Sequence, residues 1–141
     1  MPNTLYDKAR ESFLKGEINW LSDTIKVALV NNDYIPNIET HQYLTDITTG
    51  IIQKSVALNE KSTTKGVAGA ANVTFSTANE DTAVPAGNVA AIIIYQQANT
   101  DANSRLIAYI NQINGLPFAT TATSTDLTIH WDQGPNKIFK L

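Results

Sequence analysis

The sequence predicts a mostly β fold: an antiparallel β-sandwich, with the jelly roll as one candidate arrangement, preceded by a short amino-terminal α-helix. Three observations lead to this prediction. About seven short segments alternate in polarity or are rich in β-branched residues, as sandwich strands are. Turn residues separate them at intervals typical of sandwiches. Helical spacing is clear in only one segment, at the amino terminus.

Residues 1–17 contain the expected helix. Thr4 can cap it, with Asp7 three residues later, and Gly16 stands where a glycine ends many helices. This helix must dock either on the protein's own sheet or on a neighbouring subunit, and its own sheet is the favoured choice. Trp20 extends the apolar surface beyond the glycine and is expected to pack in the core. The apolar stripe of the helix consists of Leu5, Ala9 and Phe13.

The next segment, 24–30, alternates with a period of two and predicts a strand with one well-buried face. Turn residues fill 31–37, and one or two helical turns are expected within 40–47. A second strand is expected over 51–58. The polar residues 59–66 predict a mobile loop between two strands.

Residues 67–76 predict a strand. Residues 89–95 are apolar throughout, which is typical of a strand covered on both faces in the centre of a sheet. They are expected to form a hairpin with 105–111. Two further strands are expected, one over 127–131 and a short one over 137–141. The expected loops and turns in this part are 79–82, 114–117 and 133–136.

Length and composition predict one domain covering residues 1–141, with the helix in 1–17 and the strands and loops in 24–141. The formal net charge is −3, from 10 Lys and Arg against 13 Asp and Glu. This balance argues against nucleic acid or an anionic membrane as the main partner. The chain has no Cys, so thiol catalysis and disulfides are excluded. The first residues lack the pattern of a signal peptide, and the apolar runs are too short to span a membrane.

Residues that could carry catalysis or bind a metal are few, so we expect neither an enzyme nor a cofactor. The two histidines, His41 and His130, would have to converge from distant segments to form a metal site. His130 with Thr128 and Asp132 could form a proton relay, but an exposed polar strand face explains them as well. Adjacent carboxylates in a polar loop indicate solvent-facing charge rather than a glycosidase pair. The carboxylate pairs considered are Glu80 with Asp81 and Asp23 with Asp46.

Several motifs resemble a family of small virion proteins of tailed bacteriophages. They lie in 5–30, 40–47, 66–75, 104–110 and 131–141, and thus cover most of the chain outside the loops. Characteristic pieces are Gly16-Glu17-Ile18-Asn19-Trp20, Ser104-Arg105-Leu106-Ile107-Ala108-Tyr109-Ile110 and Asn136-Lys137-Ile138-Phe139-Lys140-Leu141. The resemblance implies a capsid decoration or cement protein on the virion surface, made in the host cytoplasm. The implied partner is the major capsid protein, which the chain would bind as a homo-oligomer, either a dimer or a trimer.

Under this hypothesis the contacts are expected at the amino-terminal helix, in the loop 31–37 and in the loop 59–66. The candidate contact residues are Leu5, Phe13, Trp20, Tyr34, Ile35, Lys61 and Lys65. Two other functions stay open: a tail or host-attachment component whose loop tips bind a receptor or fibre, and a small phage-encoded hydrolase. The hydrolase is disfavoured because no catalytic set is recognisable.

Overall fold

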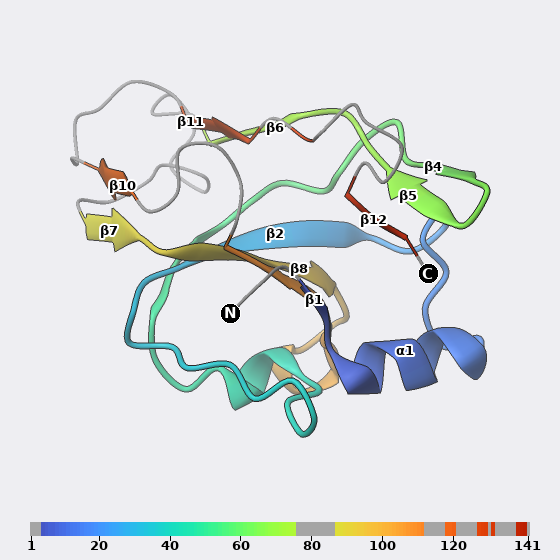
Figure 1. The fold of residues 1–141 in the computed structure, drawn as a ribbon, viewed down its shortest axis with the longest axis horizontal. Helices are drawn as coiled ribbons and strands as arrows, with labels where there is room; N and C mark the ends of the chain where they lie inside the picture. Colours follow the sequence, from blue (N-terminus) through green and yellow to red (C-terminus); the bar gives the residue numbers. More distant parts are fainter. Residues whose placement is uncertain are drawn as a thin grey trace.

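The computed structural model describes residues 4–75, 87–111, 118–120, 127–129, 131 and 138–140. The described part is mostly β, with one short α-helix near the amino terminus, so the predicted fold class is confirmed (Figure 1). The helices and strands, in chain order, are β1 (Thr4–Leu5), α1 (Asp7–Leu14), β2 (Ile25–Val30), η1 (Leu44–Asp46), β3 (Ile51–Lys54), β4 (Ser62–Thr64), β5 (Val67–Gly69), β6 (Val73–Phe75), β7 (Gly87–Val89), β8 (Ala91–Gln96), η2 (Asp101–Asn103), β9 (Arg105–Ile110), β10 (Phe118–Thr120), β11 (Leu127–Ile129) and β12 (Phe139–Lys140).

A five-stranded antiparallel sheet with the order β1-β9-β8-β2-β3 forms the centre of the fold. Its middle strand is β8, and every residue of β8 is buried. The prediction of a core strand over 89–95 is therefore confirmed, as is its hairpin with β9. Strand β2 differs from its prediction, because both of its faces are buried rather than one. Leu29 points into one hydrophobic cluster and Ala28 into another, on the opposite side of the sheet.

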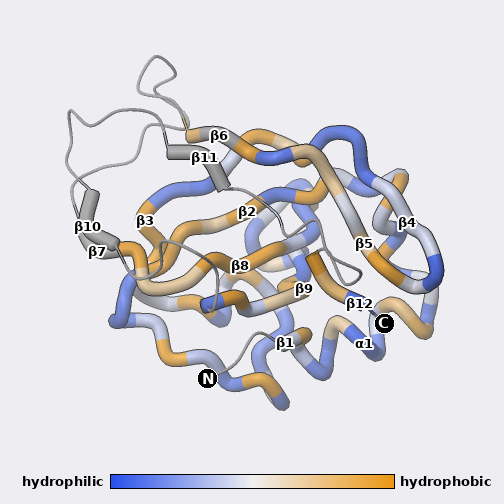
Figure 2. The backbone as a smooth tube through the Cα atoms, turned by 45° about the horizontal axis from the view of Figure 1, so that its top comes forward, coloured by the Kyte–Doolittle hydropathy of each residue, from blue (hydrophilic) through white to orange (hydrophobic). Residues whose placement is uncertain are grey.

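These two clusters lie on the two faces of the central sheet. The first continues into β5, β6 and Trp131, so the small sheets cover that face. The second includes Tyr6, Tyr34 and Leu44, so α1 and the residues between β2 and β3 cover the other face (Figure 1). Hydrophobic residues follow β2 and β8 between these layers (Figure 2). The finer sandwich or jelly-roll arrangement stays a prediction.

The amino terminus differs from its prediction. Thr4 does not cap the helix, because Thr4 and Leu5 pair with β9 as strand β1, and α1 begins at Asp7 with Tyr6 as its N-cap. Leu5 therefore packs in the first cluster and Ala9 in the second, so they do not share a face. The predicted glycine stop is confirmed, since Gly16 follows α1 with a φ of +74°.

The predicted loop 59–66 is also different, because it contains strand β4. β4 and β5 form a tight hairpin in which Thr64 pairs with Val67. The turn residues Lys65 and Gly66 have φ values of +53° and +78°. Two positive φ angles in a two-residue turn are typical of type I′, whose twist matches that of the strands. The sequence lacks the Asn-Gly signal for this turn.

Other boundaries are shorter than expected. The helical turns expected within 40–47 reduce to the 3-10 turn η1, and the strand expected over 51–58 ends at Lys54. The strand expected over 67–76 is divided into β5 and β6.

Some predictions lie outside the described residues. They are the expected loops and turns at 79–82, 114–117 and 133–136 and the residues His130 and Asp132. In the described part, no helix is both long enough and apolar enough to cross a membrane.

Candidate functional site

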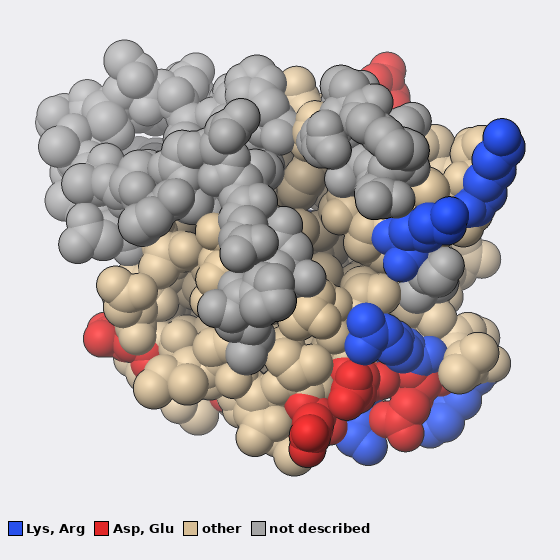
Figure 3. Space-filling model, viewed as in Figure 1, with Lys and Arg blue, Asp and Glu red and all other residues tan. Residues whose placement is uncertain are grey.

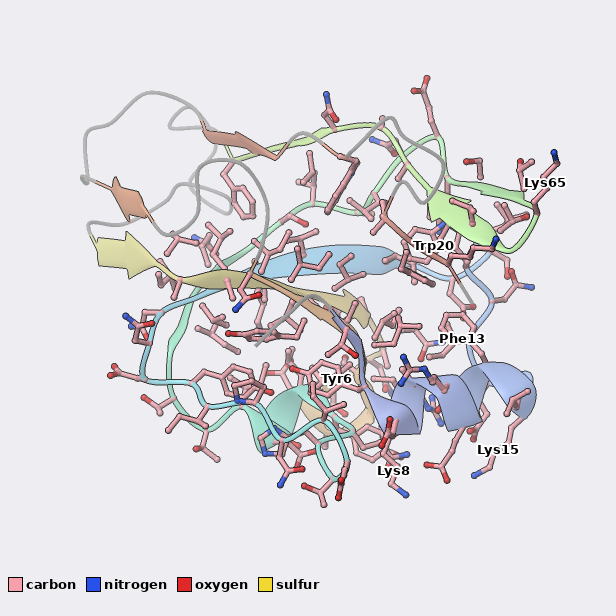
Figure 4. All side chains as sticks on the ribbon, viewed as in Figure 1. Tyr6, Lys8, Phe13, Lys15, Trp20 and Lys65 are labelled. Carbon is pink, nitrogen blue, oxygen red and sulfur yellow. The ribbon has the colours of Figure 1, made fainter. Side chains whose placement is uncertain are left out.

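An aromatic cluster joins α1 to the carboxyl-terminal strand. The ring of Phe139 lies 6.1 Å from that of Phe13 and 5.2 Å from that of Trp20, with an edge-on contact to Trp20. The Trp20 indole Nε1–H donates a hydrogen bond of 3.1 Å to the carbonyl oxygen of Gly69 in β5. These contacts fix α1, the segment that carries Trp20 and the two paired strands β5 and β12 to one another at one end of the molecule (Figure 4).

Several lysines belong to the same segments as this aromatic cluster or to the β4-β5 hairpin that Trp20 contacts. The Lys61 ammonium donates a hydrogen bond to the carbonyl oxygen of Asp23. This contact joins the segment between α1 and β2 to the start of the β4-β5 hairpin. Burial lowers the pKa of Lys61, while the charge of Asp23 acts in the opposite direction. Lys65 is exposed at the hairpin tip, and Lys140 is exposed on β12, which pairs with β5. In Figure 3, lysine and arginine side chains gather at the end of the molecule that carries α1 and the β4-β5 hairpin, and around α1 they alternate with Asp and Glu side chains.

Two leucines add exposed apolar surface at the same end. Leu14, the last residue of α1, is 89% exposed, and Leu21, next to Trp20, is 52% exposed. Figure 4 shows Lys65, Trp20, Phe13 and Lys15 in succession along this end. We call this surface the helix-hairpin edge. It comprises Phe13, Leu14, Lys15, Trp20, Leu21, Lys61, Lys65, Phe139 and Lys140.

A second surface feature is the loop 31–41, which we call the Ile35 loop. The Ile35 side chain at its tip is 79% exposed, whereas its neighbour Tyr34 is 6% exposed. The Tyr34 hydroxyl lies 2.7 Å from the Tyr6 hydroxyl and 2.9 Å from Nδ1 of His41. One buried side chain thus anchors a loop that presents an isoleucine to solvent.

Several backbone contacts hold this loop. The Asn31 N–H donates to the carbonyl oxygen of Gly50, and the Asp7 N–H donates to that of Ile38. Gly50 has a φ of +101°, and a Cβ there would come within 2.8 Å of the Tyr34 nitrogen. The close approach and the positive φ together require glycine. Within the loop, the Asn37 side-chain oxygen accepts hydrogen bonds from two backbone N–H groups.

The hydrogen-bond directions in the anchor follow from its donors. In the neutral imidazole of His41, Nδ1 accepts a hydrogen bond from the Asn37 N–H, and the Tyr34 hydroxyl donates to the same nitrogen. The Tyr6 hydroxyl then donates to the Tyr34 oxygen. Burial raises the pKa of Tyr34 to about 12 and also raises that of Tyr6. Both hydroxyls are protonated at neutral pH and serve to position the loop.

The segment that carries the Ile35 loop is acidic. Asp33, Glu39 and Asp46 are exposed, and no Lys or Arg occurs between residues 31 and 53. Asp46 accepts hydrogen bonds of 2.8 Å from the N–H groups of Gln42 and Tyr43. Burial acts to raise the pKa of Asp46, but these two hydrogen bonds and the nearby His41 outweigh it, so the pKa is lowered.

The predicted contact residues fall into two groups and one exception. Phe13, Trp20, Lys61 and Lys65 meet at the helix-hairpin edge, and Tyr34 and Ile35 belong to the Ile35 loop. Leu5 is buried in the first cluster, and Trp20 and Tyr34 are also buried, so these three support a surface rather than present one. Ile35 and Lys65 are exposed, and Phe13 and Lys61 are partly buried. Leu14 and Leu21 were not predicted, because nothing in their spacing distinguishes an exposed leucine from a core one.

The described residues contain no group of three or more His, Asp or Glu side chains that could hold a metal ion. His41, which could be a ligand or a base, has its Nδ1 engaged by Tyr34 and Asn37. Neither surface therefore brings a recognisable catalytic set together within the described part. Both place exposed apolar side chains within a polar or charged surround, and an apolar centre with a polar rim is typical of protein-binding surfaces.

Comparison with known proteins gives no relative: no family model matches the chain, and no curated protein or solved structure is similar enough to count as a match.

Proposed function

We propose that this chain is a bacteriophage capsid decoration protein that binds the lattice of the major capsid protein as a homo-oligomer. The observation that carries this proposal is the rigid support of exposed apolar side chains at two places. Ile35 projects from a loop anchored by Tyr34, and Leu14 and Leu21 flank the aromatic cluster. The resemblance of the sequence motifs to small virion proteins of tailed phages gives the biological setting.

Rigid support matters because binding costs conformational entropy. A loop that is already ordered loses less freedom when it docks than a flexible one does. A decoration protein also repeats the same contact many times over a lattice, so modest contacts add up through multivalency when the protein is an oligomer. The low charged fraction of 16% fits a surface that binds through apolar and hydrogen-bonding groups.

The test is binding of the purified protein to capsids assembled without it. After incubation, capsids are separated by sedimentation and the bound chain is quantified. We expect saturable binding and a higher temperature of capsid disruption. The variants Ile35→Asp and Leu14→Asp should each reduce binding at least about tenfold, because a charge would enter an apolar contact.

The matched control is Val56→Asp, at an exposed apolar residue that belongs to neither surface. It should bind like the wild type, and circular dichroism should show that all three variants are folded. Failure of the wild-type protein to bind capsids would refute the proposed function. Equal binding by all variants would refute the assignment of the contacts.

A further inference from the structure

We infer that the Ile35 loop of one copy docks on the helix-hairpin edge of a second copy, so that the chain associates with itself head to tail. This inference rests on the proposed function and assigns both surfaces to the contact between copies, so that Ile35→Asp and Leu14→Asp weaken capsid binding by breaking up the oligomer whose multivalency holds it on the lattice.

The charges of the two surfaces are complementary. Asp33 and Glu39 are exposed on the Ile35 loop, and Asp46 is exposed close behind it, in a stretch without Lys or Arg. On the helix-hairpin edge, Lys65 and Lys140 are exposed. None of these five residues takes part in an ion pair with another residue that the structure describes.

Acidic residues near the helix-hairpin edge reduce its positive charge but do not reverse it. Glu60 is exposed beside Lys61, whereas Glu17 pairs with Arg105 at 3.3 Å. Lys15 at the end of α1 adds a further exposed positive charge to the edge. The helix-hairpin edge therefore stays positive, although the chain as a whole is negative.

The apolar parts are complementary as well. Ile35 protrudes between acidic neighbours, and Leu14 and Leu21 are exposed among lysines. An apolar centre with a polar rim is the usual anatomy of a specific protein interface, and here the rim of each surface is charged. Docking would remove Ile35 and the leucines from water while it brings the opposite charges together.

The two surfaces lie at different places on the fold, although α1, which carries Leu14 and Lys15 of the edge, covers the same face of the central sheet as the Ile35 loop. The Ile35 loop covers the face of the second cluster, and the hairpin belongs to the layer over the first (Figure 1). A symmetric dimer that joined either surface to itself would bring like charges together. A contact between different surfaces is heterologous, and it generates a closed ring such as a trimer, or an open chain.

The test uses two charge-reversal variants of the full chain and measures mass by analytical ultracentrifugation. The edge variant is Lys65→Glu/Lys140→Glu, and the loop variant is Asp33→Lys/Glu39→Lys. We expect the wild type to associate and each variant alone to be monomeric, with dissociation constants raised at least about tenfold, because both of its surfaces carry the same sign. An equimolar mixture should associate again, since each variant then offers the surface that the other needs.

Salt supplies a second measurement. Association of the wild type should weaken as ionic strength rises from on the order of 0.05 M to 0.5 M, because exposed charges are screened. The control variant Lys8→Glu/Glu11→Lys exchanges an ion pair of α1 outside both surfaces and should behave like the wild type. A monomeric wild type at all concentrations, or a mixture that stays monomeric, would overturn the inference. The measurement contains no capsids, so its failure is distinct from failure of capsid binding.

Discussion

The tyrosine pair that anchors the Ile35 loop gives a quantitative prediction. In the variant Tyr34→Phe, the hydroxyl group between Tyr6 and His41 is removed and little else changes. Tyr6 is completely buried, so its hydroxyl would lose the Tyr34 oxygen in surroundings that water does not reach. His41 would keep the hydrogen bond from the Asn37 N–H.

The expected cost follows from what is left unpaired. A buried donor that loses its partner costs about 1–3 kcal/mol, so Tyr34→Phe should lower the free energy of unfolding by that amount. Tyr6→Phe should cost less, about 0.5–1.5 kcal/mol, because the Tyr34 hydroxyl keeps its hydrogen bond to His41. The double variant should cost clearly less than the sum of the two, since it leaves no buried hydroxyl without a partner.

The assay is urea denaturation of the four proteins in the cycle, with thermal denaturation in parallel. A loss of 2 kcal/mol corresponds to a decrease in Tm of about 4–8 °C for a chain of roughly this length. The matched control is Tyr95→Phe. The Tyr95 hydroxyl is buried and has no hydrogen-bond partner among the described residues, so its removal should be neutral or stabilising.

Strictly additive single and double variants would refute the hydrogen-bonded pair. So would a Tyr34→Phe variant as stable as the wild type. A Tyr95→Phe variant that loses as much stability as Tyr34→Phe would show that hydroxyl removal alone, rather than a lost partner, determines the cost.

Three further predictions concern the Ile35 loop and the residues that follow it. Gly50→Ala should destabilise the protein by about 2 kcal/mol or more, because an L residue is strained at a φ of +101° and its Cβ would approach the Tyr34 nitrogen. Stability should be complete below pH 10 and decrease as the pH rises towards 12, because the folded state raises the pKa of Tyr34 from 10.0 to about 12 and so disfavours tyrosinate. Asp46→Ala should cost about 1 kcal/mol at neutral pH, since the Gln42 and Tyr43 N–H groups lose their acceptor, and the difference from the wild type should shrink as acid protonates Asp46.

Each of these has a direct check. Urea denaturation measures the free energy of unfolding of Gly50→Ala and Asp46→Ala. The neutral control is Thr48→Ala, at an exposed residue of the same segment. Unchanged stability of Gly50→Ala would contradict the close approach. Tyrosinate absorbance, recorded with circular dichroism, measures the alkaline transition, and titration of Tyr34 near pH 10 in the folded protein would contradict its burial. A stability difference for Asp46→Ala that persists at the lowest pH would contradict the role of the carboxylate.

The parts of the fold that could be predicted from the sequence are those with a strong local pattern. The apolar run that becomes β8 specifies a strand buried on both faces, and the alternation in β9 specifies its hairpin partner. Thr4 and Leu5 could not be assigned correctly, because their local pattern allows a helix cap while β9 offers an edge for pairing. The turn at Lys65 has no Asn-Gly signal, so the strand pairing on either side determines it.

For the two surfaces as well, the features with a local sequence pattern could be predicted, and those that depend on contacts between distant residues could not. The exposure of Ile35 and Lys65 agrees with their turn-like surroundings. The anchor between Tyr6 and Tyr34 joins residues 28 positions apart, and no local pattern indicates it. Likewise, the aromatic cluster joins Phe13 to Phe139, which only the pairing of β12 with β5 brings into reach.

The most direct test of the central proposal is the amount of this chain relative to the major capsid protein in purified virions, measured by quantitative mass spectrometry. A decoration protein should be present at a simple ratio set by the lattice, such as about one copy, or about one third of a copy, per capsid subunit. A ratio of a few per cent would contradict the capsid role and point to a tail component. Absence from virions would contradict both.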